Sequence, residues 1–213
     1  MAQNSPHHTG LTLYTQTGER KYLSSIERSR FFNSIGNLCN PFDRTFCEML
    51  FWTGCRPSEA LALTAMHIDV DDAVVVIQSL KKRGDAKGNH FRAIPVPKRF
   101  IELLRTVHFV KAKQLFRTGG QHQRLWQMSR STAWKRVKRV MEEADIHGVR
   151  ASAKGLRHTY GVHAVLSNVP ETRIKKWLGH NSLATTEIYL DVVAGEDRAL
   201  AERMWEEEIP NRR

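Results

Sequence analysis

The stretch GLRHTY at residues 155–160, with LGHNSLATTEIY at residues 178–189, is the most informative part of this sequence for fold and function. About a hundred residues upstream, TGCRPSEAL at residues 53–61 adds a second arginine in a similar setting. Guanidinium groups stay ionised and can donate hydrogen bonds to two oxygens of a phosphate at once. Tyrosine is a recognised covalent nucleophile. The two arginines, two histidines and last tyrosine therefore suit attack on a phosphodiester.

These boxes resemble the catalytic domain of the tyrosine recombinases, the phage-integrase family of site-specific DNA strand exchangers. The resemblance covers roughly residues 24–205. Arg56 matches the first arginine of the family, Arg157 the second, His180 the Leu-Gly-His box and Tyr189 the nucleophile. The resemblance implies a reaction without metal or cofactor, in which the tyrosine becomes linked to a 3′ phosphate and a 5′ hydroxyl leaves.

The second box departs from the family pattern at one position. The family usually has His-x-x-Arg-His, whereas Lys154 stands here in place of the first histidine, three residues before Arg157. Lysine still donates a hydrogen bond but is a poorer base than imidazole near neutral pH. His158 is expected to pack or buttress the site and not to react.

The family also uses a lysine from a β-hairpin as general acid for the departing 5′ oxygen. Lys81, at the end of the first expected strand, is the first candidate for this role. Lys87 fits a different register of the hairpin, and Lys82 is a third candidate. A hairpin tip that only binds phosphate, without catalysis, is the alternative.

The charge balance points to a polyanionic partner. Lysine and arginine number 33 against 22 acidic residues, a net charge of +11 with a pI near 9.9. An excess of this size favours nucleic acid as the partner and a strong salt dependence of binding, and the resemblance implies that the partner is double-stranded DNA. The residues expected to contact DNA are Lys82, Arg83 and Lys87 in the hairpin and Arg130, Lys135, Arg136 and Arg139 in a later helix.

The patterning predicts a mainly helical α+β domain with one small antiparallel hairpin or sheet near its front. The hairpin strands are expected at residues 74–80 and 91–96 because these are rich in β-branched residues or alternate. Helices are expected at residues 24–37, 42–52, 57–63, from 99 onward, 131–144, 154–167, 171–178, 183–189 and 196–208. In the helix at 131–144, Trp134 and Val137 are expected to face inward.

The cysteines and the apolar runs exclude other classes of protein. Cys39, Cys47 and Cys55 lack metal-ligand spacing, so we expect buried apolar side chains and neither disulfides nor a metal site. No apolar run approaches the roughly 20 residues of a membrane span, and the first ten residues do not form a secretory signal. The expected location is the cytoplasm, at the bacterial nucleoid.

Domain organisation follows from the same resemblance. Residues 1–22 are expected to be an arm or linker, and residues 23–213 the catalytic domain. The family's N-terminal core-binding domain is not expected here, which suggests an excised fragment or a short recombinase. A homo-oligomer on DNA, a tetrameric synapse with the C-terminal helix packed in trans, is implied. The alternatives are a type IB topoisomerase-like activity and a DNA-binding accessory module that does not cleave.

Overall fold

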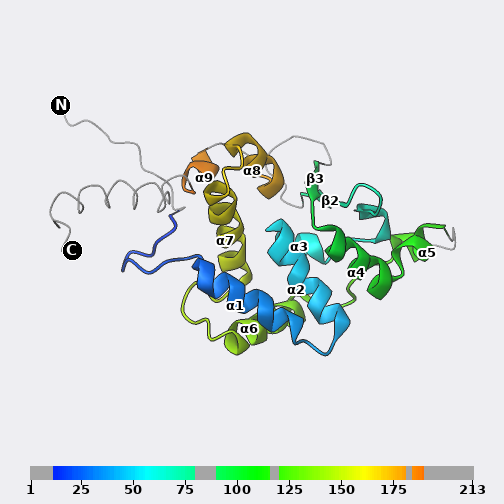
Figure 1. The fold of residues 1–213 in the computed structure, drawn as a ribbon, viewed down its shortest axis with the longest axis horizontal. Coiled ribbons are helices and arrows are strands. Elements are labelled where there is room, and N and C mark those ends of the chain that lie inside the picture. Colours follow the sequence, from blue (N-terminus) through cyan, green and yellow to red (C-terminus); the bar gives the residue numbers. More distant parts are fainter. Residues whose placement is uncertain (1–11, 80–89, 116–119, 181–183, 190–213) are drawn as a thin grey trace, which may run out of the picture.

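The computed structural model describes residues 12–79, 90–115, 120–180 and 184–189 (Figure 1). These residues form helices and a three-stranded antiparallel sheet, which confirms the expected fold class. The elements are α1 Ser25–Gly36, α2 Pro41–Thr53, α3 Pro57–Ala60, η1 Ala65–His67, β1 Ile68–Asp69, β2 Val74–Gln78, β3 Phe91–Pro95, α4 Lys98–His108, α5 Val110–Leu115, η2 Gly120–His122, α6 Arg130–Glu143, α7 Ala153–Leu166, α8 Glu171–Leu178 and α9 Ala184–Glu187. The expected helix at 196–208 and the hairpin tip at 80–89 lie outside the described residues.

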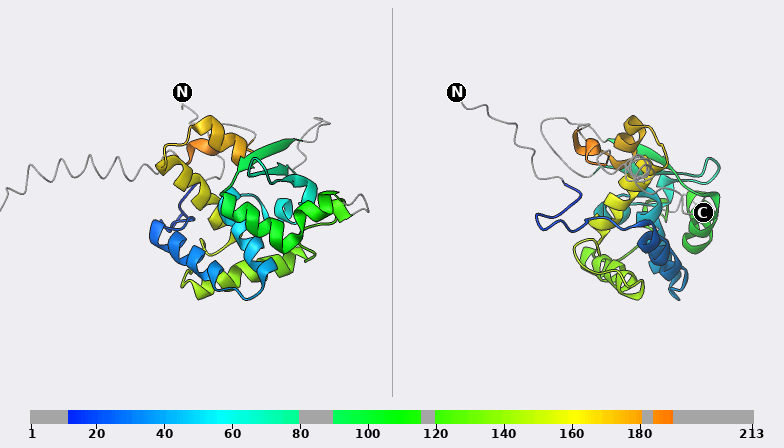
Figure 2. Two further views of the ribbon diagram at one scale, coloured as in Figure 1. Left: turned by 45° about the vertical axis from the view of Figure 1, so that its right-hand side comes forward. Right: turned by 60° about the vertical axis from the view of Figure 1, so that its left-hand side comes forward.

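Helix α2 is central to the arrangement and contacts α1, α4 and α7 (Figure 1). Helices α1 and α6 run side by side at one end of the molecule, as both views in Figure 2 show. Helices α8 and α9 lie at the far end of α7, and α8 contacts strand β3. The first and second arginine boxes are therefore brought together through α2 and α7.

The helix ends explain why these elements start and stop where they do. Ser24 and Glu27 form the expected capping box of α1, which satisfies two backbone N–H groups at its start. Asn40 caps α2 and is followed by a proline, whose fixed φ suits the first helical position. Gly54 ends α2 with a φ of 60°. A side chain there would also meet the Tyr160 ring at 2.7 Å, so this turn requires glycine.

The sheet has the order β1-β2-β3 with both pairings antiparallel. In the β2–β3 pairing Ile77 lies opposite Arg92 and Val75 opposite Ile94. All four of these side chains are buried, because alternate residues of a strand point to the same face. The hairpin was expected, whereas β1 was not.

Two expectations about buried residues were wrong. Cys47 and Cys55 are buried, but Cys39, which precedes the N-cap of α2, is exposed. Trp134 is 56% exposed, although helical spacing placed it inward. The buried stripe of α6 runs through Ala133, Val137, Val140 and Met141, and Trp134 lies at its edge, where it borders a cleft.

Helix α3 is also shorter than the expected 57–63. It ends at Ala60, and the backbone carbonyl of Leu63 instead accepts a hydrogen bond from the N–H of Leu125. This long-range contact ties the turn after α3 to the segment before α6. Among the described helices, none has the length and apolar character needed to cross a membrane.

Candidate active site

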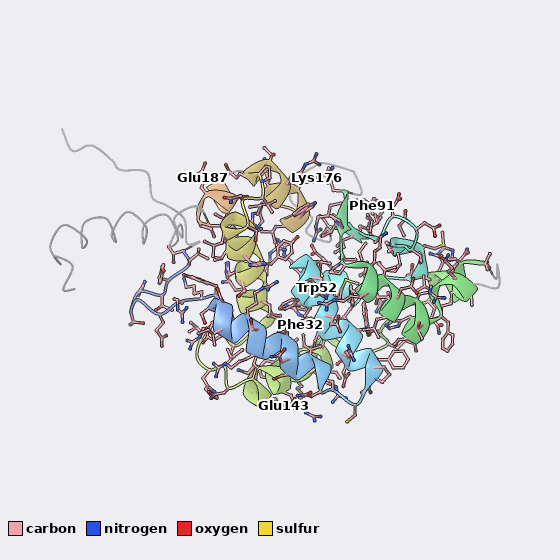
Figure 3. The ribbon with its side chains drawn as sticks, in the orientation of Figure 1. Phe32, Trp52, Phe91, Glu143, Lys176 and Glu187 are labelled. Atoms are coloured by element: carbon pink, nitrogen blue, oxygen red, sulfur yellow. The ribbon has the colours of Figure 1, made fainter. Side chains whose placement is uncertain are left out.

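A cleft of about 1010 Å³ lies where α3, α6, α7, α8 and β3 approach one another. Phe91 of β3 and Lys176 of α8, both in its lining, are labelled at the same upper end of the molecule in Figure 3. The expected site residues that line the cleft are Arg56, Arg130, Lys154, Arg157, His180 and Tyr189. Within the described ranges, no three His, Cys, Asp or Glu side chains form a group that could hold a metal ion.

Arg56 precedes Pro57 and is the N-cap residue of α3. Its Nη1 donates to Glu59 Oε1 at 2.8 Å, and its backbone N–H donates to Glu59 Oε2 at 2.9 Å. The Glu59 side chain is 1% exposed, whereas the Arg56 side chain is 32% exposed. A buried carboxylate therefore holds a guanidinium group that still reaches the cleft.

Arg157 lies one turn into α7, whose start is capped by Ser152. Its Nη1 donates to the carbonyl oxygen of Gly54 at 2.9 Å and its Nη2 to that of Leu178 at 2.6 Å. Burial, followed by the positive charge of Arg56, lowers the pKa of Arg157 to about 10. The group is still ionised at neutral pH, and its orientation is fixed by the ends of two other helices.

His180 follows the left-handed Gly179, which ends α8 with a φ of 67°. Its Nδ1 lies 3.0 Å from the hydroxyl oxygen of the buried Thr186. Burial and the charges of Arg157 and Arg56 lower its pKa to about 3, so the ring is neutral near pH 7. The ring is nearly parallel to that of Tyr189, with centroids 6.0 Å apart.

Tyr189 follows α9 and is 1% exposed. Its hydroxyl lies 3.3 Å from Nδ1 of His158, which is also buried. Burial raises the pKa of Tyr189 to about 12, against the opposing effect of the Arg157 and Arg56 charges. Burial and the charges of Lys154 and Arg157 lower the pKa of His158 to about 4. A neutral imidazole thus faces a protonated phenol.

The remaining expected residues are distributed unevenly. Lys154 is exposed in the first turn of α7, and Arg130 and Trp134 border the cleft from α6. Lys135 is exposed on α6 but is not part of the cleft lining. Arg136 pairs with Asp43 and Arg139 with Glu143, also away from the lining. Lys81, Lys82, Arg83 and Lys87 lie outside the described residues.

Glu59, Gly161 and Arg92 contact the site residues, although the sequence boxes predicted no site role for them. Glu59 sits in the quoted first box, but its contact with Arg92 joins residues 33 positions apart. A Cβ on Gly161 would lie 2.6 Å from Cζ of Tyr189, so the ring packs directly on this glycine. Gly161 follows His158 by three residues, the spacing of one helix face, which is a signal that could have been used.

The phage integrase family model matches residues 30–196, more than half of the chain. The chain belongs to the phage integrase family. This confirms the resemblance on which the expected fold and site residues rested.

Curated relatives agree with this assignment. The chain is 31% identical to the tyrosine recombinase XerD of Haemophilus influenzae over 193 residues, 86% of this chain and 62% of the relative. It is 26% identical over 163 residues to XerA of Thermococcus kodakarensis, 76% of this chain and 55% of that one. The chain thus spans less than two thirds of the length of these relatives.

Two solved structures show the same fold. The XerH recombinase in a post-cleavage complex with palindromic difH substrate superposes with a TM-score of 0.72 at 20% identity, covering 93% of this chain and 57% of that one. The catalytic domain of bacteriophage HP1 integrase gives 0.57 at 19% identity, covering 80% of this chain and 86% of that one. The latter is itself a catalytic domain, and the similarity extends over most of it.

Proposed function

We propose that this chain is a site-specific recombinase that breaks and rejoins DNA by transesterification through Tyr189. The observation that most supports this proposal is the convergence of Arg56, Arg157, His180 and Tyr189, from separate elements, on one cleft. Membership of the phage integrase family and the relatives named tyrosine recombinases point in the same direction.

In the proposed step, Oη of Tyr189 attacks the phosphorus atom of a DNA phosphodiester. A bond forms between this oxygen and the 3′ phosphate, and the bond from phosphorus to the 5′ oxygen breaks. Although His158 was expected only to buttress the site, we propose that its Nδ1, 3.3 Å from the phenol, accepts the phenolic proton, because its neutral imidazole has a free lone pair in the matching tautomer. A hairpin lysine protonates the departing 5′ oxygen: Lys81 first, with Lys87 and Lys82 as alternatives. Rejoining reverses these transfers.

The charge that develops on the phosphate is met by fixed donors. Arg56 and Arg157 each present N–H groups to the non-bridging oxygens, and such preorganised groups need no rearrangement during the reaction. We assign the tautomer of His180 in which Nδ1 accepts from Thr186 and Nε2–H donates to the same phosphate. Lys154, exposed near the start of α7, adds positive charge at the rim and donates a hydrogen bond.

Double-stranded DNA is the proposed partner. The basic residues of α6 (Arg130, Lys135, Arg136 and Arg139) and of the hairpin (Lys82, Arg83 and Lys87) would contact its phosphates, giving affinity that falls steeply with salt. We further propose that four copies assemble on paired DNA sites, each passing its C-terminal helix to a neighbour. We also propose the bacterial nucleoid as its location in the cell.

Covalent trapping tests the proposal. The protein is mixed with labelled duplexes nicked near the presumed crossover, taken from DNA beside its gene, in EDTA, and separated on a denaturing gel. A band of lower mobility is expected with the wild-type chain and not with Tyr189→Phe. Mass spectrometry of the adduct should identify Tyr189 as the linked residue.

The alternative functions predict different results with the same two proteins, wild type and Tyr189→Phe. Salt-dependent DNA binding without an adduct, equal in wild type and Tyr189→Phe, would indicate a DNA-binding accessory module. An adduct together with relaxation of supercoiled DNA, but no exchange between two sites, would indicate topoisomerase-like activity. Exchange of flanking markers on a two-site substrate is the outcome that the proposal requires.

A further inference from the structure

Arg92 occupies a position where the sheet pattern calls for an apolar side chain. It is one of the two buried residues of β3, with Ile94 the other, and it is 4% exposed. Its register partner Ile77 is fully buried on the same face. A buried ion pair is often no more stabilising than well-packed apolar residues. A function other than stability is therefore worth seeking for this guanidinium group.

The donors of Arg92 reach three separate segments of the chain. Its Nη2 pairs with Glu59 Oε2 of α3 at 2.5 Å, and its Nη1 donates to Ser79 Oγ, after β2, at 2.9 Å. Its Nε donates to the backbone carbonyl oxygen of Trp177, near the end of α8, at 2.8 Å. Arginine makes these bonds from three nitrogen atoms held in one plane, whereas a lysine would have to reach all three acceptors from a single nitrogen.

Two of these contacts, with Glu59 and with Trp177, lead to proposed catalytic residues. The Glu59 carboxylate that pairs with Arg92 also binds the guanidinium and the backbone N–H of Arg56. Trp177 precedes the turn that carries His180, and a Cβ on Gly179 in that turn would lie 3.2 Å from Cζ of Arg92. Burial alone would raise the pKa of Glu59, but the charge and hydrogen bonds of Arg92, with those of Arg56, lower it.

We propose that Arg92 is a positioning residue that fixes Arg56 and His180 relative to each other. It acts through Glu59 on one side and through the end of α8 on the other. This inference rests on the proposed function, since it concerns the geometry of the same site. Loss of the guanidinium hydrogen bonds of Arg92 should leave the fold in place, while Arg56 and His180 lose their alignment relative to each other.

The test compares Arg92→Lys and Arg92→Met with the wild type in single-turnover cleavage of a nicked duplex at saturating protein. Displacement of catalytic groups by about 1 Å costs roughly 100-fold in rate, and this is the expected loss for Arg92→Met. Compared with Arg92→Met, Arg92→Lys restores the positive charge beside Glu59 but not the three guanidinium hydrogen bonds. Its Tm should therefore return toward the wild-type value while its cleavage rate stays low. DNA affinity should change less than about twofold for both variants, because Arg92 is buried.

Arg44→Met is the matched control. Arg44 also pairs with a buried glutamate, Glu48, at 3.0 Å, but on α2 and outside the cleft lining. It should keep the wild-type cleavage rate. A cleavage rate for Arg92→Lys that recovers together with Tm would assign Arg92 a purely structural role and overturn the inference.

An observation that does not need activity separates this inference from the proposed function. The Cε1–Hε1 NMR signal of His180, assigned with His180→Gln, should shift in Arg92→Lys and stay in place in Arg44→Met. If the wild type forms no adduct with DNA, the proposed function fails, but this signal still decides whether Arg92 sets the His180 turn. An unshifted signal in Arg92→Lys would refute the positioning role.

Discussion

Acidification from pH 7 to 5 should weaken the fold through histidines whose pKa is lowered in the folded chain: the buried His108 and His158, together with His180. Burial, then the charge of Lys113, lowers the pKa of His108 to about 4, and burial, then Lys154 and Arg157, does the same for His158. Histidine in an unfolded chain titrates near 6.5. Between these values the unfolded chain binds protons that the folded chain does not, so the free energy of unfolding falls as the pH falls.

The magnitude follows from the same shifts. Each histidine lowers the free energy of unfolding by about 1.4 kcal/mol per pH unit inside the window, or about 2 kcal/mol between pH 7 and 5. His108 and His158 together give about 4 kcal/mol, a large part of the 5–15 kcal/mol typical of a domain, and His180, with its pKa lowered to about 3, adds to this loss. The carboxyl groups of Glu27 and Glu59, whose pKa values are lowered, contribute stability that is lost only below their unfolded value near 4.3. The interval from pH 7 to 5 therefore isolates the histidines.

Urea denaturation followed by tryptophan fluorescence, at constant ionic strength, measures this loss. His158→Gln should remove about 2 kcal/mol of the pH-dependent loss, because one titrating group is gone. Gln127→Ala is the control, since Gln127 is exposed and carries no titratable group. Stability that is flat or rises on acidification, or an identical loss in wild type and His158→Gln, would refute the reasoning.

Three substitutions test other contacts of the site. Glu59→Gln should lower stability by about 3–5 kcal/mol, measured by urea denaturation, because Arg92 loses its buried counter-charge; a variant as stable as wild type would contradict this. In Gly161→Ala the new Cβ would lie 2.6 Å from the Tyr189 ring, so the ring should be displaced and nitration of Tyr189, detected by mass spectrometry, should be faster. An unchanged nitration rate would show that the ring keeps its position and that the surrounding residues adjust. Gly155→Ala places a Cβ 1.9 Å from the carbonyl oxygen of Arg150, so a loss of about 1–3 kcal/mol is expected in thermal unfolding, and an unaltered Tm would argue against it.

Features encoded by short-range patterns could be predicted from the sequence. The capping box at Ser24 and Glu27 and the glycine that ends α2 are local signals, and both elements formed as expected. The alternation at residues 91–95 gave the second hairpin strand. The four residues Arg56, Arg157, His180 and Tyr189 were chosen from boxes that match a family, and all four line one cleft.

Features that depend on distant contacts could not be predicted. The contact between His158 and Tyr189 joins residues 31 positions apart, and no local pattern specifies which imidazole meets the phenol. The same holds for Glu59 and Arg92, since a strand pattern does not reveal that an inward position holds a charge. Helical period alone also fails at the edge of a stripe, where Trp134 borders a cleft instead of the core.

The tethering of Arg157 has a consequence for any anion that enters the cleft. Two of the five N–H groups of this guanidinium are already bonded to the main chain, at Gly54 and Leu178. The plane of the group is thereby set before a ligand arrives, so it cannot swing to follow a misplaced oxygen. The ligand must therefore adjust its position to the guanidinium group. A polymer with regularly spaced anions can bind only in registers that bring one anion into that plane. The arginine thus acts as a fixed reference point for alignment along the ligand.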